Sequence, residues 1–275
     1  MRLNTVFVLC TPDPASSNVG GQLKKLGGFE KEASAGGKEL FASRDAMIVS
    51  IDSIHIHREG LDDEIERDFG LRPDRLVFMS THRSATNTPA ITFHPIGNYG
   101  EARLGGMPCE AVPSCPELMT GLLLSMQAKE HDGYQVTYEA THHGPHLRTP
   151  ALFAEIGSDE NAWRDEEAGG RLAAVLLSMS ESEGVNAIGI GGGHYCSRFK
   201  EIAQKRKINF GHFIPNHSLP SIDEKVASMI AERSPGTAHY VIHEDRKNMD
   251  GIERVAGLME AAGLRRLDHQ SAELR

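Results

Sequence analysis

The stretch that indicates the fold most directly is QVTYEATHHGPH, residues 135–146. Its first six residues are β-branched, aromatic and alternating, a pattern typical of a strand. Gly144-Pro145 then excludes a helix immediately afterwards, because proline cannot continue one. A polar loop at the carboxyl end of a strand is where α/β proteins commonly place their sites. We therefore expect an α/β fold with a functional loop at His142, His143 and His146.

Short apolar runs alternate with helical stretches along the rest of the chain, which is the βαβ pattern of a largely parallel sheet. The predicted strands are Val6–Cys10, Met47–Ile51, Arg75–Met79, Ile91–Phe93, Tyr134–Ala140, Ala187–Ile190, Ile208–Phe213 and His239–Ile242. The predicted helices are Asp62–Phe69, Pro116–Lys129, Asn161–Ser180, Arg198–Lys205, Ile222–Glu232 and Ile252–Ala262. We interpret Gly27 to Gly37 and Pro145 to Asp159 as flexible connections. The fold class predicted is α/β, with a mixed, largely parallel sheet flanked by helices.

The chain is long enough to bury a large core, at 275 residues, and no Pro/Gly/Ser-rich linker divides it. We predict a single α/β catalytic unit over residues 1–275. A smaller lobe within about 80–150 stays open as an alternative.

Composition excludes several classes of protein. A hydrophobic share of 39% and a charged share of 24% are ordinary for a globular chain and argue against disorder. No apolar run approaches the length of a membrane span, and the N-terminus lacks the features of a signal peptide. Four cysteines without a C-x-x-C pair are no disulfide framework. We expect a cytoplasmic protein with reduced thiols and no membrane partner.

The net charge of −9 counts against wholesale nucleic-acid binding, because phosphate neutralisation needs clustered cations. Five cations nevertheless fall within ten residues, in Arg198-Phe199-Lys200 and Lys205-Arg206-Lys207. Two interpretations stay open, a solvated helix face and a local nucleic-acid contact.

Histidines gather in loops that follow predicted strands. Four such segments hold eight of the fourteen histidines, and three of these lie beside Glu139 in the loop at His142, His143 and His146. Imidazole and carboxylate are ligands that Zn²⁺ prefers. The alternative is a set of hydrogen-bonded loop or core histidines, but the clustering favours metal binding or catalysis. The spacing is not H-E-x-x-H, since Gly-Pro breaks the helix that this motif requires.

A glycine-rich turn, Gly191-Gly192-Gly193-His194, follows another predicted strand. Its backbone N–H groups can approach an anion or a carbonyl oxygen. It is not the dinucleotide motif, because His194 occupies the position of the third glycine. A tight strand-to-helix turn without a ligand is the alternative.

Several of these motifs together resemble the archaeal and plant type of D-aminoacyl-tRNA deacylase, a zinc-containing family. The matching stretches are Thr81-His82-Arg83-Ser84, Asn87-Thr88-Pro89-Ala90, His94-Pro95-Ile96-Gly97-Asn98, Ala140-Thr141-His142-His143-Gly144-Pro145 and Gly191-Gly192-Gly193-His194-Tyr195. The likeness covers nearly the whole chain. It implies hydrolysis of the ester that joins a D-amino acid to tRNA, and a phosphorylase/hydrolase-like fold related in shape to peptidyl-tRNA hydrolase.

The residue roles are assigned from the pattern of side chains. The expected metal ligands are His142, His143 and His146, with His94 or His82 completing the set. Glu139, His194 and His82 are the expected catalytic residues, Glu139 as base, ligand or orienting group. The expected substrate-binding residues are Gly191, Gly192, Gly193, Tyr195, Arg83 and Asn98. Lys200, Lys205, Arg206 and Lys207 are expected to steer tRNA.

Two rival functions stay open at this point. One is an α/β metallo-amidase or peptidase that acts on a small substrate, and the other is a non-catalytic RNA- or metal-binding protein. We expect a monomer or a weak oligomer in either case.

Overall fold

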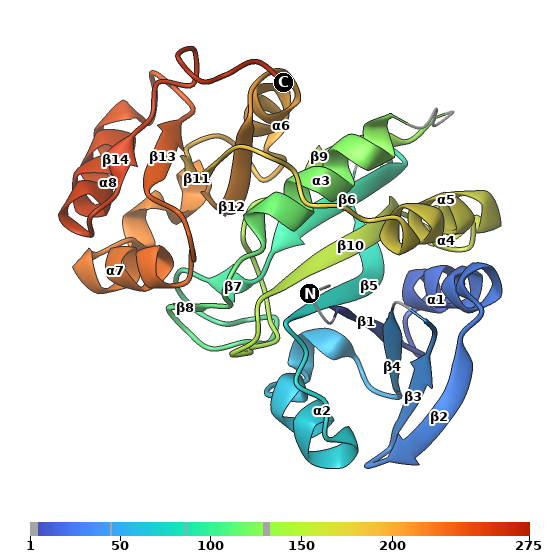
Figure 1. Cartoon of the computed structure of the whole chain (residues 1–275). Coiled ribbons are helices and arrows are strands. Elements are labelled where there is room, and N and C mark those ends of the chain that lie inside the picture. The colour runs from blue at the N-terminus through green and yellow to red at the C-terminus, as the bar shows by residue number, and fades with distance from the viewer. Residues whose placement is uncertain (1–4, 45, 86, 129–132) are drawn as a thin grey trace.

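Two twisted sheets form the frame of the molecule in the computed structural model, which describes residues 5–44, 46–85, 87–128 and 133–275 (Figure 1). The larger sheet contains β1 (Thr5–Cys10), β2 (Glu30–Ala35), β3 (Lys38–Ala42), β4 (Met47–Ile51), β5 (Arg75–Arg83), β6 (Ala90–Pro95), β9 (Gln135–Tyr138) and β10 (Ala151–Ser158). The smaller sheet contains β11 (Val185–Ile190), β12 (Ile208–Ile214), β13 (His239–Ile242) and β14 (Arg265–Arg266). A short pair is formed by β7 (Gly97–Asn98) and β8 (Glu110–Ala111).

Helices connect and cover these strands. They are α1 (Pro14–Gly27), α2 (Leu61–Phe69), α3 (Pro116–Gln127), α4 (Glu160–Trp163), α5 (Glu166–Leu177), α6 (Ser197–Lys205), α7 (Glu224–Glu232) and α8 (Met249–Ala261), with short 3₁₀ turns at η1 (His55–His57) and η2 (Asn216–Ser221). Within the described ranges, no helix combines the length and the apolar character needed to cross a membrane.

The larger sheet is mixed, in the order β2-β3-β4-β1-β5-β10-β6-β9. Its centre is parallel, since β4, β1, β5 and β10 pair in one direction. Strand β6 joins β10 in the antiparallel sense, and β9 follows β6 in parallel. All pairings in the smaller sheet are parallel. The predicted mixed, largely parallel sheet flanked by helices is confirmed.

The two faces of the larger sheet have different surroundings. One face carries an apolar core that α1, α3 and α5 cover, and this core continues through α3 to the smaller sheet. The opposite face packs its apolar residues against Leu61 and Ile65 of α2. A second core lies between the smaller sheet and helices α7 and α8 (Figure 1).

All eight predicted strands are present, with small differences at their ends. The interpretation of Gly27–Gly37 and Pro145–Asp159 as flexible connections is wrong, because β2 and the central strand β10 lie there. Helix α1 and strand β3 were also not predicted. Gly20 lies within α1 although glycine disfavours helices, because the helix packs closely on β1 and a Cβ there would lie 2.5 Å from Leu9 Cδ1.

The predicted helix Asn161–Ser180 is wrong as a single element. It is divided into α4 and α5, because the Asp165 side chain accepts hydrogen bonds from the backbone N–H groups of Glu167 and Ala168 and begins a new helix. The other predicted helices are present, with ends that shift by a few residues. The predicted end of one of them, Lys129, lies outside the described residues.

Candidate active site

A polar stripe crosses the face of the larger sheet that α2 only partly covers. Strand register aligns Glu155 of β10 with Ser80 of β5 and with Thr92 of β6. Because side chains alternate along a strand, His82 and His94 share this face, two residues further along β5 and β6. Glu139 follows β9, whose Thr137 is aligned with Thr92, so its carboxylate comes to the same face. The stripe is buried, and its polar groups must therefore bind one another or a ligand.

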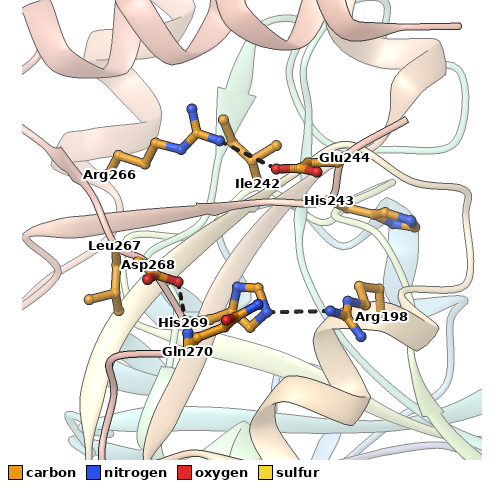
Figure 2. A pocket seen from close by; sticks show the side chains of 9 residues that line it. All are labelled: Arg198, Ile242, His243, Glu244, Arg266, Leu267, Asp268, His269 and Gln270. Atoms are coloured by element: carbon orange, nitrogen blue, oxygen red, sulfur yellow. Dashed lines mark hydrogen bonds and ion pairs between the residues drawn. The ribbon is translucent and has the colours of Figure 1, made fainter. Parts of the chain in front are cut away.

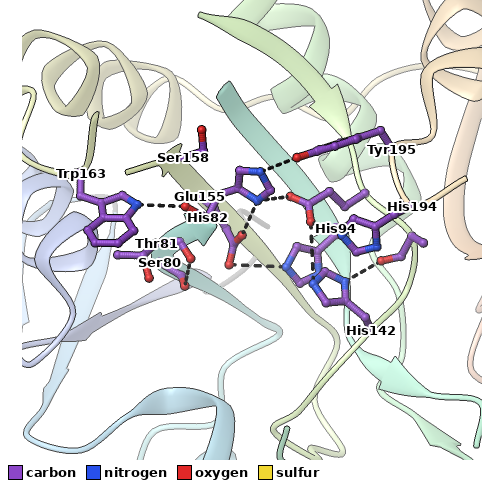
Figure 3. Close-up of polar contacts among 12 residues, drawn as sticks. Ser80, Thr81, His82, His94, His142, Glu155, Ser158, Trp163, His194 and Tyr195 are labelled. Atoms are coloured by element: carbon purple, nitrogen blue, oxygen red, sulfur yellow. Dashed lines mark hydrogen bonds and ion pairs between the residues drawn. The ribbon is translucent and has the colours of Figure 1, made fainter. Parts of the chain in front are cut away.

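Glu139 is the centre of the hydrogen-bonding network, and Figure 3 labels its partners His82 and His194. Its Oε1 lies 2.9 Å from His82 Nδ1, and its Oε2 lies 2.8 Å from His194 Nε2. The side chain of Glu139 is only 1% exposed, whereas that of His194 is 43% exposed. Tyr195, which is partly exposed, places its hydroxyl 2.8 Å from His82 Nε2. The arrangement joins a buried carboxylate to a histidine at the surface.

Glu155 is a second buried carboxylate beside this network. One of its oxygens lies 3.7 Å from His82 Nδ1 and the other lies 3.6 Å from His94 Nε2. Glu155 is not among the predicted site residues, because it lies in the segment interpreted as a flexible connection. A single acidic residue within the apolar run Ala151–Ser158 was the available signal, since a carboxylate is rarely buried without a partner.

Three histidines form a group next to the carboxylates. The ring of His94 lies 4.1 Å from that of His142 and 4.9 Å from that of His143, between centroids. In each ring Nδ1 faces a backbone carbonyl oxygen, that of Pro95 at 3.0 Å, Ala140 at 2.7 Å and Gly144 at 2.6 Å respectively. A nitrogen that faces a carbonyl carries the proton, so in His142 and His143, which burial keeps neutral, Nε2 is left as an electron-pair donor.

Burial and neighbouring charges set the protonation states of the group. Burial lowers the pKa of His142 well below its ordinary value and lowers that of His143 to about 4, with His94 adding to both effects. Burial also lowers the pKa of His82, but Glu139 and Glu155 outweigh it and raise the pKa to about 11. Burial raises the pKa of Glu139, but hydrogen bonds from His194 and His82 hold it well below its ordinary value.

The donor atoms are close enough to hold a metal ion. Three overlapping groups each keep their ligand atoms within 4.8 Å of one another. They are His94, His142 and His143; Glu139, His142 and His194; and His82, Glu139 and Glu155. Among the described residues, His94 Nε2 is buried and makes no hydrogen bond, and it lies 3.6 Å from a Glu155 oxygen. Burial lowers the pKa of His94, but Glu155 outweighs burial and raises it, whereas His142 and His143 are neutral. Neutral imidazoles beside carboxylates are the donors that Zn²⁺ binds, so the first group fits such an ion.

Backbone contacts bring the loops of the two sheets together at this point. The N–H of Ala140 donates to the carbonyl of His194, and the N–H of Gly97 donates to the carbonyls of His142 and His143. Gly144 has no room for a side chain, because a Cβ there would meet the backbone nitrogen of Gly106 at 2.1 Å. The histidine loop is therefore held from both sides.

Some of the predicted site residues lie away from this cluster. His146 is in none of the three ligand groups, and its backbone N–H donates to the Glu59 carboxylate. Asn98 donates to the carbonyl of Gly105 and so holds a neighbouring loop. The Arg83 guanidinium lies over the ring of Trp163, 4.6 Å from its centre.

The glycine turn lies at the edge of the site. Gly191 and Gly192 pack against His243, whereas Gly193 is exposed and a Cβ there would meet no atom within 4 Å. Both Gly191 and Gly192 have positive φ, which favours glycine.

The four predicted tRNA-steering residues differ in their surroundings. Lys205 is exposed at the end of α6, and Lys200 is partly exposed on the same helix. Arg206 donates to the carbonyl of Ala272, and Lys207 pairs with Glu273 at 2.7 Å.

Comparison with known proteins identifies the same family that the sequence motifs resemble. A family model described as D-aminoacyl-tRNA deacylase matches residues 69–267. The D-aminoacyl-tRNA deacylase of Methanosarcina mazei is 35% identical over 283 residues, which cover 98% of this chain and 93% of the relative. That of Pyrococcus furiosus is 35% identical over 212 residues, which cover 76% of this chain and 78% of the relative.

A solved structure has the same fold as this chain. The crystal structure of a conserved protein of unknown function superposes with a TM-score of 0.91 at 25% sequence identity, covering 99% of this chain and 98% of that one. Futalosine hydrolase of Helicobacter pylori aligns over 65% of this chain with a TM-score of 0.45 and 12% identity, values too low to support a conclusion. The family match and the relatives confirm the resemblance: this chain belongs to the D-aminoacyl-tRNA deacylase family of hydrolases.

Proposed function

We propose that this chain hydrolyses the ester bond between a D-amino acid and the terminal ribose of tRNA, at the cluster around Glu139. The observation that carries the proposal is the buried Glu139 carboxylate, which contacts both His82 and His194 and lies next to the group of three histidines. The chain that holds this arrangement belongs to the deacylase family. Water attacks the ester carbonyl carbon, the bond from that carbon to the ribose oxygen breaks, and the ribose oxygen takes up a proton. The products are a free D-amino acid and tRNA.

His194 is suited to accept the proton of the attacking water. Its Nε2 donates to Glu139, so its Nδ1 is the free electron-pair donor, and its side chain is partly exposed. Glu139 then holds the correct tautomer and stabilises the charged ring, as the acidic member of a catalytic triad does.

His82 and Tyr195 are suited to stabilise the oxyanion. Because its pKa is raised to about 11, His82 is protonated and donates through Nε2 to the Tyr195 oxygen. The Tyr195 O–H is then directed toward the substrate, where a donor lowers the energy of the developing negative charge.

Zinc is the metal we propose for the histidine group. His94, His142 and His143 would hold it. A bound zinc ion supplies a water of lowered pKa and polarises a carbonyl. His146 is no longer part of the proposed ligand set, since its side chain is in none of the ligand groups.

Single substitutions test this proposal. We expect His94→Ala, His142→Ala and His143→Ala to lose bound zinc and about 100-fold or more in the hydrolysis of D-aminoacyl-tRNA. His146→Ala is the matched control and should keep both. Zinc content by elemental analysis and hydrolysis of D- against L-aminoacyl-tRNA, with and without chelator, are the measurements. Full metal and full activity in all three variants would end the metal-site proposal.

The same assay addresses the rival functions. A small-molecule amidase or peptidase would act on free esters or amides without RNA. A non-catalytic binding protein would bind D-aminoacyl-tRNA without turnover. Family membership favours the deacylase over both.

A further inference from the structure

The smaller sheet has its own topological switch point. Its strand order is β12-β11-β13-β14, and all neighbours are parallel. From β11 the chain passes through α6 to β12 on one side, and then crosses to β13 on the other side of β11. In open parallel sheets, ligands bind at the carboxyl ends of the strands where the connections diverge in this way. Here that position lies between the loops that follow β11 and β13.

A cleft of about 670 Å³ opens at this carboxyl edge (Figure 2). Its walls come from α6 and from the segments that follow β13 and β14. The lining residues are Arg198, Ile242, His243, Glu244, Arg266, Leu267, Asp268, His269 and Gln270. A second cavity of about 250 Å³ shares Arg198, His269 and Gln270 with the first and extends along α6 to Lys205 and Arg206. The two form one groove, which the network around Glu139 does not use.

The cations of this cleft are available for exchange with a ligand. Arg198 contacts the exposed Glu201 at 3.2 Å and His269 Nε2 at 3.3 Å. Arg266 pairs at 3.2 Å with Glu253 and at 3.9 Å with Glu244, and both carboxylates are exposed. Exposed pairs of this kind contribute little stability, so a phosphate can replace the carboxylates.

The remaining groups suit the other parts of a ribonucleotide. Glu244 and Asp268 can accept hydrogen bonds from ribose hydroxyls, as acidic residues do in nucleotide sites. His243 and His269 offer flat rings for a base to stack on, and burial lowers the pKa of His269 so that its ring is neutral. Gln270 supplies an amide that can bind a base edge.

The cleft is joined to the active site by the glycine turn. His243 packs against Gly192, where a Cβ would lie 2.6 Å from its Nδ1. His194, which binds Glu139, comes two residues after Gly192. Arg198 is three residues from Tyr195, a backbone reach of about 10 Å at most. A single-stranded RNA end can therefore occupy both positions at once.

We propose that this cleft binds a nucleotide of the single-stranded 3′ end of tRNA, next to the aminoacylated ribose. This inference rests on the proposed function. It assigns the recognition of RNA to Arg198, Arg266 and the other residues that line the cleft. The net charge of −9 does not oppose it, because the contact is local.

Binding of the trinucleotide CpCpA, the 3′ end of mature tRNA, tests the proposal without any ester. By titration calorimetry we expect Arg198→Gln and Arg266→Gln each to weaken binding at least fivefold. Arg72→Gln, an equal charge change at an exposed arginine that pairs with Glu66, should leave it unchanged. The deoxy form, d(CpCpA), should bind more weakly than CpCpA, because the carboxylates lose the 2′-hydroxyl.

Each outcome separates the cleft from the chemistry. Equal binding of CpCpA by both arginine variants and the wild type overturns the subsite, even if D-aminoacyl-tRNA is hydrolysed. Binding that depends on both arginines upholds the subsite, even where deacylation fails and the proposed function falls.

Discussion

At the scale of single residues, His82 keeps its position because its neighbour on β10, Gly157, has no side chain. Gly157 of β10 is aligned with His82 of β5. A Cβ on Gly157 would lie 2.4 Å from the His82 carbonyl oxygen and 2.6 Å from its Cβ. Backbone atoms between paired strands cannot move aside, so any larger residue displaces the imidazole from Glu139 and Glu155.

We therefore expect Gly157→Ala to reduce kcat/KM for D-aminoacyl-tRNA at least tenfold and to destabilise the fold by about 1–3 kcal/mol. The matched control is Gly170→Ala in α5, where a Cβ would meet only Gln22 at 3.9 Å. That change should stabilise by up to about 1 kcal/mol, since alanine favours a helix. Thermal unfolding and steady-state deacylation are the measurements. Normal values for both in Gly157→Ala would show that His82 needs no such space.

Some residues of the candidate site could be predicted because they are neighbours in sequence. Glu139, His142 and His143 fall within five residues, and a strand followed by Gly-Pro indicates that they share a loop. Glu155 has no such neighbours, and only the register of β10 against β5 and β6 brings it to them. His146 lies close to these residues in sequence, yet it is in none of the ligand groups and its backbone N–H donates to Glu59.

At the scale of elements, strand formation depended on pairing that local preference does not reveal. Strand β10 contains alanine, glycine and glutamate, which disfavour strands, yet it is paired on both sides at the centre of the sheet. Helix α1 has serines and glycines in its interior, and the Asp13 cap with Pro14 compensates. Strands with a continuous apolar run, such as β1, were predictable from the sequence alone.

The Asp165 carboxylate should make α5 sensitive to acid. Burial raises its pKa, but hydrogen bonds from Ala168 and Tyr134, among others, outweigh this and hold the pKa below its ordinary value of 3.8. A lowered pKa in the folded state means stability that is present above about 3.8 and is lost as the pH falls through the folded value.

We expect Asp165→Ala to lower the free energy of unfolding by about 1 kcal/mol at pH 7, as loss of an N-cap does. Asp165→Asn, which keeps a capping oxygen without a charge, should restore most of this loss. Urea denaturation at pH 7 and near pH 3 is the measurement. The difference between wild type and Asp165→Ala should shrink at the lower pH, and a constant difference would contradict the role of the charge.

At the scale of the whole molecule, the candidate site lies where loops of the two sheets meet, since the N–H of Ala140 donates to the carbonyl of His194, and the proposed nucleotide cleft lies at the carboxyl edge of the smaller sheet. The alternation of strands and helices predicted one α/β class, because βαβ order is written in local periodicity. It did not predict two sheets, since strand order depends on which edges pair. The loop after β11 contributes to both sites, with His194 toward Glu139 and Gly192 toward His243. The two proposed roles, recognition of RNA and hydrolysis, thus fall on neighbouring strand ends.

The groove along α6 should make the reaction sensitive to salt. If Lys205 contacts a tRNA phosphate, Lys205→Gln should reduce the slope of log kcat/KM against log salt by about 1, because one fewer counterion is released. Lys207→Gln should change the slope less, since Lys207 already pairs with Glu273 and lies 3.8 Å from Glu183. Lys25→Gln in α1 removes the same charge from another helix and should leave the slope unchanged.

Deacylation of D-aminoacyl-tRNA from 50 to 300 mM salt, roughly the range where phosphate contacts weaken, is the measurement. Equal slopes for Lys205→Gln and Lys25→Gln would mean that α6 does not guide the RNA.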